Sequence, residues 1–126
     1  MDKQNIASSA AIPPIGPYSP GLAVGDFVFV SGQVPLDREG KIVDIIAPDQ
    51  ARTSLENMRA QLAEVGLGMD AMVKTTVFLA DMNDFAAVNE VYAESFTEPY
   101  PARSTVQVAR LPKDVRVEIE GIAVRG

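Results

Sequence analysis

The chain of 126 residues contains no cysteine and no histidine. Without cysteine there are no disulfides, no thiolate nucleophiles and no sulfur-ligated metal sites. Without histidine the usual general base, the Ser/His/Asp triad and most zinc sites are absent as well. We therefore expect no bound metal, and any chemistry must come from Arg, Lys, Tyr, Ser, Thr, Asp or Glu side chains.

Positive charge is also scarce, with 11 Lys and Arg against 17 Asp and Glu and a net charge of −6. This balance argues against a nucleic-acid partner, and an anion site would need local cations. No apolar run approaches the roughly 18–20 residues of a membrane span, so we expect no membrane association. Residues 1–11 lack the pattern of a secretory signal, which favours a cytoplasmic location.

A hydrophobic content of 47% and a charged content of 22% are ordinary for a globular protein, and we expect one domain over residues 1–126. Two apolar runs at 22–24 and 27–34, split by Gly25 and Asp26, predict a β-hairpin. Further strands are predicted at 42–46, 71–79, 104–109 and 115–124.

Two helices are predicted between these strands. The first opens at Pro48 and ends near Gly66, and its apolar positions recur at steps of three and four: Ala51, Leu55, Met58, Leu62 and Val65. The second is capped by Asn83 or Asp84, with Phe85, Val88, Tyr92 and Phe96 on its buried stripe. Two helices cover only one face of the sheet, yet the strands are apolar on both faces. We therefore expect a homo-oligomer that buries the second face.

Arg103 is the first candidate functional residue, at the start of a predicted strand after Pro101 and Ala102. A guanidinium binds a planar carboxylate through two parallel hydrogen bonds, although a surface arginine is the plain alternative. Glu118 and Glu120 project from one face of the last strand and could position or activate water, or simply face solvent. The pattern suggests a site that binds a small organic acid and hydrolyses a group attached to it.

Other candidate residues are weaker on their own. Tyr18 lies in a proline-rich turn, where its ring packs against the hairpin or its hydroxyl donates to a ligand. Gly32 would let a ligand approach the backbone beside Ser31, which has no histidine to activate it as a nucleophile. Asn89, on the second helix, could be a polar contact at the edge of a cleft.

Several ordered motifs together resemble the RidA (YjgF/UK114) family of imine/enamine deaminases. The motifs are PARSTV at 101–106, VARLPKD at 108–114, VEIE at 117–120, IGPYS at 15–19, VSGQ at 30–33, SLEN at 54–57, VKTTVF at 73–78 and NDF at 83–85. The resemblance covers residues 12–125. It implies a chorismate-mutase-like α+β fold, with a mixed, mainly antiparallel sheet and two helices on one face. It also implies homotrimers with a barrel-like core and one cleft at each subunit interface.

The resemblance further implies a hydrolase that needs no metal or organic cofactor. Water adds to the imine of a 2-imino acid such as 2-iminopropanoate, the tautomer of 2-aminoacrylate, and leaves a 2-keto acid and ammonia. Such enzymes limit damage by reactive metabolites. By position, Arg103 resembles the residue that binds the substrate carboxylate, and Glu118 the residue that positions water. Tyr18, Ser31, Gly32, Asn89 and Thr105 resemble residues near the substrate.

Three features depart from the family pattern at the expected cleft. Thr105 stands where many members have cysteine, Pro20 where glutamine is common, and the stretch 97–101 is short. They bear on substrate range. Rival hypotheses are a non-catalytic 2-keto-acid binder or a regulatory, chaperone-like trimer, an endoribonuclease as attributed to some relatives, and a chorismate mutase by fold analogy alone.

Overall fold

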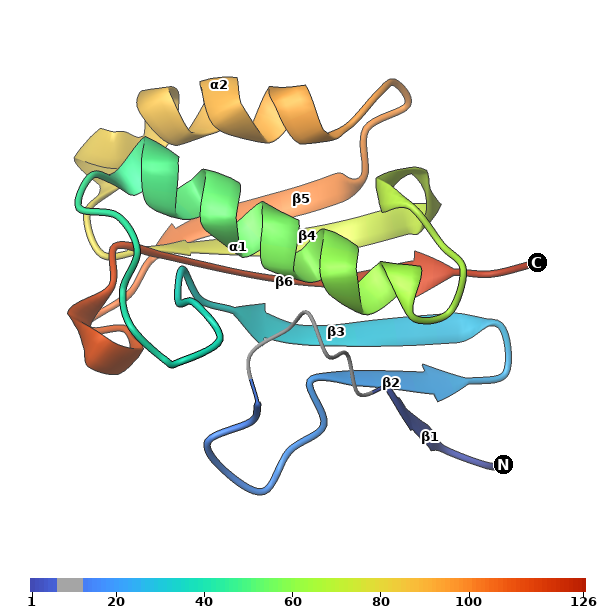
Figure 1. Cartoon of the computed structure of the whole chain (residues 1–126). Coiled ribbons are helices and arrows are strands. Elements are labelled where there is room, and N and C mark those ends of the chain that lie inside the picture. Colours follow the sequence, from blue (N-terminus) through green and yellow to red (C-terminus); the bar gives the residue numbers. More distant parts are fainter. Residues whose placement is uncertain (7–12) are drawn as a thin grey trace.

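The computed structural model describes residues 1–6 and 13–126 as a six-stranded sheet with two helices packed on one face (Figure 1). The strand order is β1-β2-β3-β6-β4-β5. Only β4 and β5 run parallel, and the other neighbours are antiparallel. The α+β class implied by the family resemblance is confirmed, and so is its mixed, mainly antiparallel sheet. The strands are β1 Gln4–Ile6, β2 Gly21–Val24, β3 Phe27–Gln33, β4 Met72–Leu79, β5 Ala102–Gln107 and β6 Val117–Val124.

The predicted hairpin is confirmed as β2 and β3, which turn at Gly25 with φ +58°. One strand was missed, and one predicted strand is absent from the structure. β1 was not predicted, because three residues with one buried side chain are too short for a period-2 pattern. Residues 42–46 form only an isolated bridge between Leu36 and Ile42. This segment leads into the first helix instead, because the Asp44 side chain accepts a hydrogen bond from the Thr53 hydroxyl.

The helices are α1 Ala47–Ala63 and α2 Phe85–Ser95, and they lie side by side over the sheet (Figure 1). The predicted stripe of α1 is buried, with Leu55, Met58 and Leu62 at 0–1% exposure. Gly66 ends the helical turn as expected. Its φ is +74°, and the Leu67 and Gly66 amides donate to the Leu62 and Ala63 carbonyls in a Schellman arrangement. Asp84 precedes α2 but makes no side-chain cap.

The sheet alternates between a covered face and a bare face. Val28, Val77 and Ile119 point toward the helices and are fully buried. Their strand neighbours point the other way, and Phe27 and Phe29 are 51% and 41% exposed, with Val106 and Val124 also exposed. The helices thus cover one face only, as the sequence predicted. No helix in the described ranges has the length and apolar character needed to cross a bilayer.

Candidate functional site

Arg103 lies in β5, at the edge of the sheet, and its side chain is on the covered face. Its register partner on β4 is Thr75, which is completely buried beneath α2. The guanidinium carbon lies 4.7 Å from the centre of the Tyr92 ring and 5.7 Å from that of Phe85. Arg103 is half-buried, and no carboxylate of residues 1–6 or 13–126 forms an ion pair with it. Its hydrogen-bond donors are therefore open to an external anion.

A pocket of about 460 Å³ opens at this arginine. α2 supplies one wall through Asn89, Tyr92 and Ala93, and the segment before β5 supplies Tyr100 and Pro101. We call this the arginine pocket. Burial raises the pKa of the Tyr92 hydroxyl, although its hydrogen bond to Thr75 and the charge of Arg103 act in the opposite direction. The tyrosine therefore stays neutral at the arginine's side. The combination suits a small carboxylate ligand with a short side chain.

Glu118 lies on β6, and its side chain is on the bare face. It pairs with Phe78 of β4, which lies three residues along the strand from Thr75, the partner of Arg103. Because successive side chains of a strand point to opposite faces, Glu118 and Arg103 lie on opposite faces of the sheet. A pocket of about 310 Å³ holds its carboxylate beside Tyr18, Ser31 and Gly32. We call this the glutamate pocket. Burial, and then the negative charge of Glu120, raise the pKa of Glu118. A half-buried carboxylate of this kind is suited to exchange a proton with water.

The backbone at Gly32 fits closely against Glu118. A Cβ placed on Gly32 would overlap the Glu118 carboxylate, so a larger residue here would displace the carboxylate from this position. The Ser31 hydroxyl donates to the Ser19 carbonyl at 2.6 Å, and the Ser31 amide donates to the Pro20 carbonyl at 3.0 Å. These bonds tie the proline-rich turn to β3. Ser31 thus helps to hold the turn that carries Tyr18.

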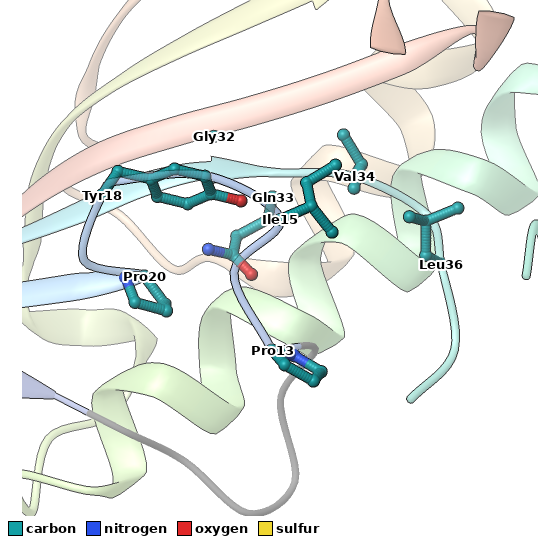
Figure 2. Close-up of a pocket in the computed structure, with 8 residues that line it drawn as sticks. All are labelled: Pro13, Ile15, Tyr18, Pro20, Gly32, Gln33, Val34 and Leu36. Atoms are coloured by element: carbon teal, nitrogen blue, oxygen red, sulfur yellow. The ribbon is translucent and has the colours of Figure 1, made fainter. Parts of the chain in front are cut away.

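A smaller, mostly apolar side pocket of about 40 Å³ adjoins the glutamate pocket (Figure 2). The two share Ile15, Tyr18, Gly32 and Val34. Figure 2 shows the Gln33 amide between Pro20 and Ile15, with the Tyr18 ring above it. The Gln33 amide nitrogen donates to the Ser31 carbonyl at 2.9 Å, which fixes that side chain. Pro20, one of the departures from the family pattern, is therefore a wall of this side pocket.

The predicted site residues fall into two groups that one chain does not bring together. Arg103 and Asn89 line the arginine pocket, while Tyr18, Ser31, Gly32 and Glu118 line the glutamate pocket on the other face of the sheet. Thr105 shares the face of Arg103, but its hydroxyl oxygen is buried and finds no partner among the described residues. The sequence could not show this separation, because the parallel register of β4 and β5 sets the face of Arg103.

Sequence reasoning placed Tyr92 in the core and missed its position beside Arg103. A signal was available in the spacing of Phe85, Asn89 and Tyr92, which are four and three residues apart and share one helical face. Nothing in that spacing indicates that an arginine from another strand lies under the face. Residues 7–12 precede the IGPYS turn and lie outside the described residues, so the family resemblance is not tested structurally at position 12.

Comparisons with known proteins identify relatives of this chain. The family model described as Endoribonuclease L-PSP matches residues 8–125. A 2-iminobutanoate/2-iminopropanoate deaminase of Salmonella typhimurium is 50% identical over 97% of this chain and 98% of its own. A RutC family protein of Pyrococcus abyssi is 49% identical over 99% of both chains. The crystal structure of E. coli TdcF with bound serine superposes with a TM-score of 0.91 at 48% identity, covering 98% and 99% of the two chains. The chain belongs to the Endoribonuclease L-PSP family, also known as the RidA (YjgF) family.

Proposed function

We propose that this protein is a deaminase that hydrolyses reactive 2-imino acids and their enamine tautomers to 2-keto acids and ammonia. The observation that carries the proposal is Arg103, whose guanidinium is sheltered in a pocket and free of any carboxylate partner in residues 1–6 and 13–126. The relationship to a named 2-iminobutanoate/2-iminopropanoate deaminase over nearly the whole chain supports it. Residues 1–126 would act as one domain, and we expect it to work in the cytoplasm.

The reaction needs positioning more than activation, because an imine carbon is already electrophilic. Arg103 binds the substrate carboxylate with two hydrogen bonds and fixes the imine carbon next to a water. Glu118 accepts a proton from that water as the new C–O bond forms, and it returns a proton to the amine nitrogen. Glu118 then takes the hydroxyl proton of this carbinolamine and passes it to the nitrogen, so that the C=O bond of the 2-keto acid forms as the C–N bond breaks and ammonia leaves. Tyr18, Ser31, Gly32, Asn89 and Thr105 would line the cleft.

The proposed site needs two chains, because Arg103 and Glu118 lie on opposite faces of one sheet. We propose a homotrimer of the chorismate-mutase-like kind, in which the bare faces of three sheets pack around a barrel-like core. The arginine pocket of one protomer would then meet the glutamate pocket of its neighbour. Exposed Phe27 and Phe29 support this packing, since a contiguous apolar face on a sheet needs a cover.

The test is a panel of imino acids generated in place by an amino-acid oxidase. We expect the protein to accelerate release of ammonia and 2-keto acid from the imines of alanine and 2-aminobutanoate, whose side chains suit the small side pocket. A non-catalytic binder would hold pyruvate or 2-oxobutanoate without changing the hydrolysis rate. If the protein is folded and oligomeric but only binds these 2-keto acids, the proposal fails, and the protein is a 2-keto-acid binding protein or a regulatory trimer.

The ribonuclease in the family's description is the weaker alternative for this chain. A net charge of −6 and the absence of histidine leave neither a basic surface for phosphates nor the usual general base. We expect no cleavage of single-stranded RNA under conditions in which imine hydrolysis is measurable. RNA cleavage that co-purifies with the oligomer and is lost in an Arg103→Ala variant would make ribonuclease activity the better-supported function.

A further inference from the structure

Two aromatic rings from α2 lie beside the guanidinium of Arg103. Tyr92 is the nearer, at 4.7 Å from ring centre to guanidinium carbon, and Phe85 lies at 5.7 Å. Both distances are within the roughly 6 Å over which a cation is attracted to an aromatic face. The two residues are seven apart and therefore lie on the same side of the helix. The helix thus presents a pair of rings to a single cation on a neighbouring strand.

Tyr92 is held far more firmly than a ring that merely fills space. It is 5% exposed, and its hydroxyl shares a hydrogen bond of 2.6 Å with the Thr75 hydroxyl. Thr75 is the β4 residue directly paired with Arg103. The Tyr92 ring also packs against Phe96, with ring centres 4.6 Å apart. Tyr92 therefore links α2 to the strand position next to Arg103.

We infer that Tyr92 is a positioning residue, whose ring holds the Arg103 guanidinium at the pocket mouth with its hydrogen-bonding edge free. The inference rests on the proposed function, in which Arg103 binds the substrate carboxylate. An aromatic face attracts a guanidinium without occupying any N–H donor. A carboxylate neighbour would also hold the arginine in place but would use the same donors as the substrate. Only the aromatic arrangement both fixes the arginine and leaves it available.

The expected effect is on substrate binding. Without the ring, Arg103 samples more rotamers, and the substrate must restrict them when it binds. The carboxylate contact is present in the bound substrate and in the transition state alike, so its weakening raises KM and leaves kcat nearly unchanged. In Tyr92→Leu we expect KM for the imine of alanine to rise about tenfold, with kcat within about twofold of the unchanged protein.

Tyr92→Phe is the conservative variant that separates positioning from structure. It keeps the ring beside Arg103 but leaves the buried Thr75 hydroxyl without its partner. We expect its melting temperature to fall and its KM to stay within about twofold. A purely structural role would lower stability in both variants without raising KM in the folded Leu protein, and that result would overturn the inference.

Val91→Ala is a matched control, because it removes buried volume from the same helix on a side away from Phe85, Asn89 and Tyr92. Its KM is expected to stay unchanged although its stability falls. If Tyr92→Leu does not fold, Phe85→Leu tests the inference instead. Phe85 supplies the second ring beside Arg103, and because it is partly exposed its replacement should leave the protein folded. The inference requires KM to rise about threefold in that variant, and an unchanged KM refutes it.

Arg103→Ala, measured in the same assay, separates this inference from the proposed function. If Arg103→Ala keeps full kcat/KM, the proposed site is wrong and Tyr92 has no cation to position. If Arg103→Ala loses activity while folded Tyr92→Leu keeps its KM, the site stands and only the role of Tyr92 fails. A raised KM in Tyr92→Leu together with lost activity in Arg103→Ala supports both.

Discussion

At the scale of single residues, the arginine pocket contains one cationic side chain, Arg103, beside the rings of Phe85 and Tyr92. Arg103 has aromatic faces beside it and no acidic neighbour in residues 1–6 and 13–126 with which it forms an ion pair. In a chain with a net charge of −6, such a site attracts a small anion only at short range. The local cation therefore matters more to ligand choice than the overall charge of the protein.

Arg103→Ala is expected to lower kcat/KM for 2-imino acids at least about a hundredfold, because two charge-assisted hydrogen bonds are lost. Arg103→Lys should recover only part of this, since an ammonium does not form the paired, planar contact. Steady-state kinetics with oxidase-generated imines would measure both. Arg59→Ala, which removes an exposed arginine from α1, is the control and should be neutral. A wild-type rate in folded Arg103→Ala would remove the arginine from the mechanism.

Glu118 should give the rate a distinctive dependence on pH. Because its pKa is raised, the ionised, proton-accepting form of Glu118 becomes dominant at a higher pH than in an ordinary glutamate, whose pKa is about 4.3. We expect kcat/KM to rise with pH through this elevated value. Glu120→Gln removes the second cause of the shift, so the rising limb should move to lower pH. A limb that stays in place after this substitution would assign it to another group.

The same shift has a consequence for stability with a definite sign. Between the unfolded and the folded pKa of Glu118, the folded chain binds more protons than the unfolded chain. The contribution of this residue to the free energy of unfolding therefore decreases as pH rises through that window. Glu118→Gln should flatten this part of the stability curve. Denaturant unfolding at several pH values measures it, and a steeper curve in the variant would contradict the assignment.

At the scale of elements, the helix-ending turn of α1 depends on one glycine. Gly66 has a φ of +74°, and nothing lies within 4 Å of a Cβ placed there. The cost of Gly66→Ala is therefore backbone strain alone, and we expect about 1 kcal/mol of lost stability in chemical denaturation. Gly66→Asn should lose less, because asparagine tolerates this conformation. Equal losses in the two variants would indicate a contact rather than strain.

The elements themselves were largely predictable from sequence, and their mutual arrangement was not. Steps of three and four located α1 and α2, and the glycine-split apolar runs located β2 and β3. The apolar run at 42–46 was misleading, because Ile45 and Ile46 are exposed and Asp44 bonds to α1 instead of a strand. Which face Arg103 occupies depends on the parallel β4–β5 register, a long-range pairing that no local pattern encodes.

At the scale of the whole molecule, the residues of the proposed site are divided between the two faces of the sheet. Mixing experiments test whether two chains complete it. Arg103→Ala and Glu118→Ala proteins, each inactive alone, would be unfolded together and refolded as mixed oligomers. If each site takes Arg103 from one protomer and Glu118 from its neighbour, about a quarter of the sites regain both residues in an equal mixture. Activity that stays at the level of the separate variants in oligomers shown to be mixed would mean that Arg103 and Glu118 do not complete a site between two chains.

In the proposed homotrimer, the packing that covers Phe27 and Phe29 on the bare face also completes the active site. On this proposal, a single protomer has Arg103 but no neighbour to supply Glu118 to its arginine pocket. Output should then depend on concentration more steeply than in direct proportion, and it should vanish on dilution and return on reconcentration. On this proposal, a lone chain is inactive, and a working catalyst forms only when enough copies have assembled.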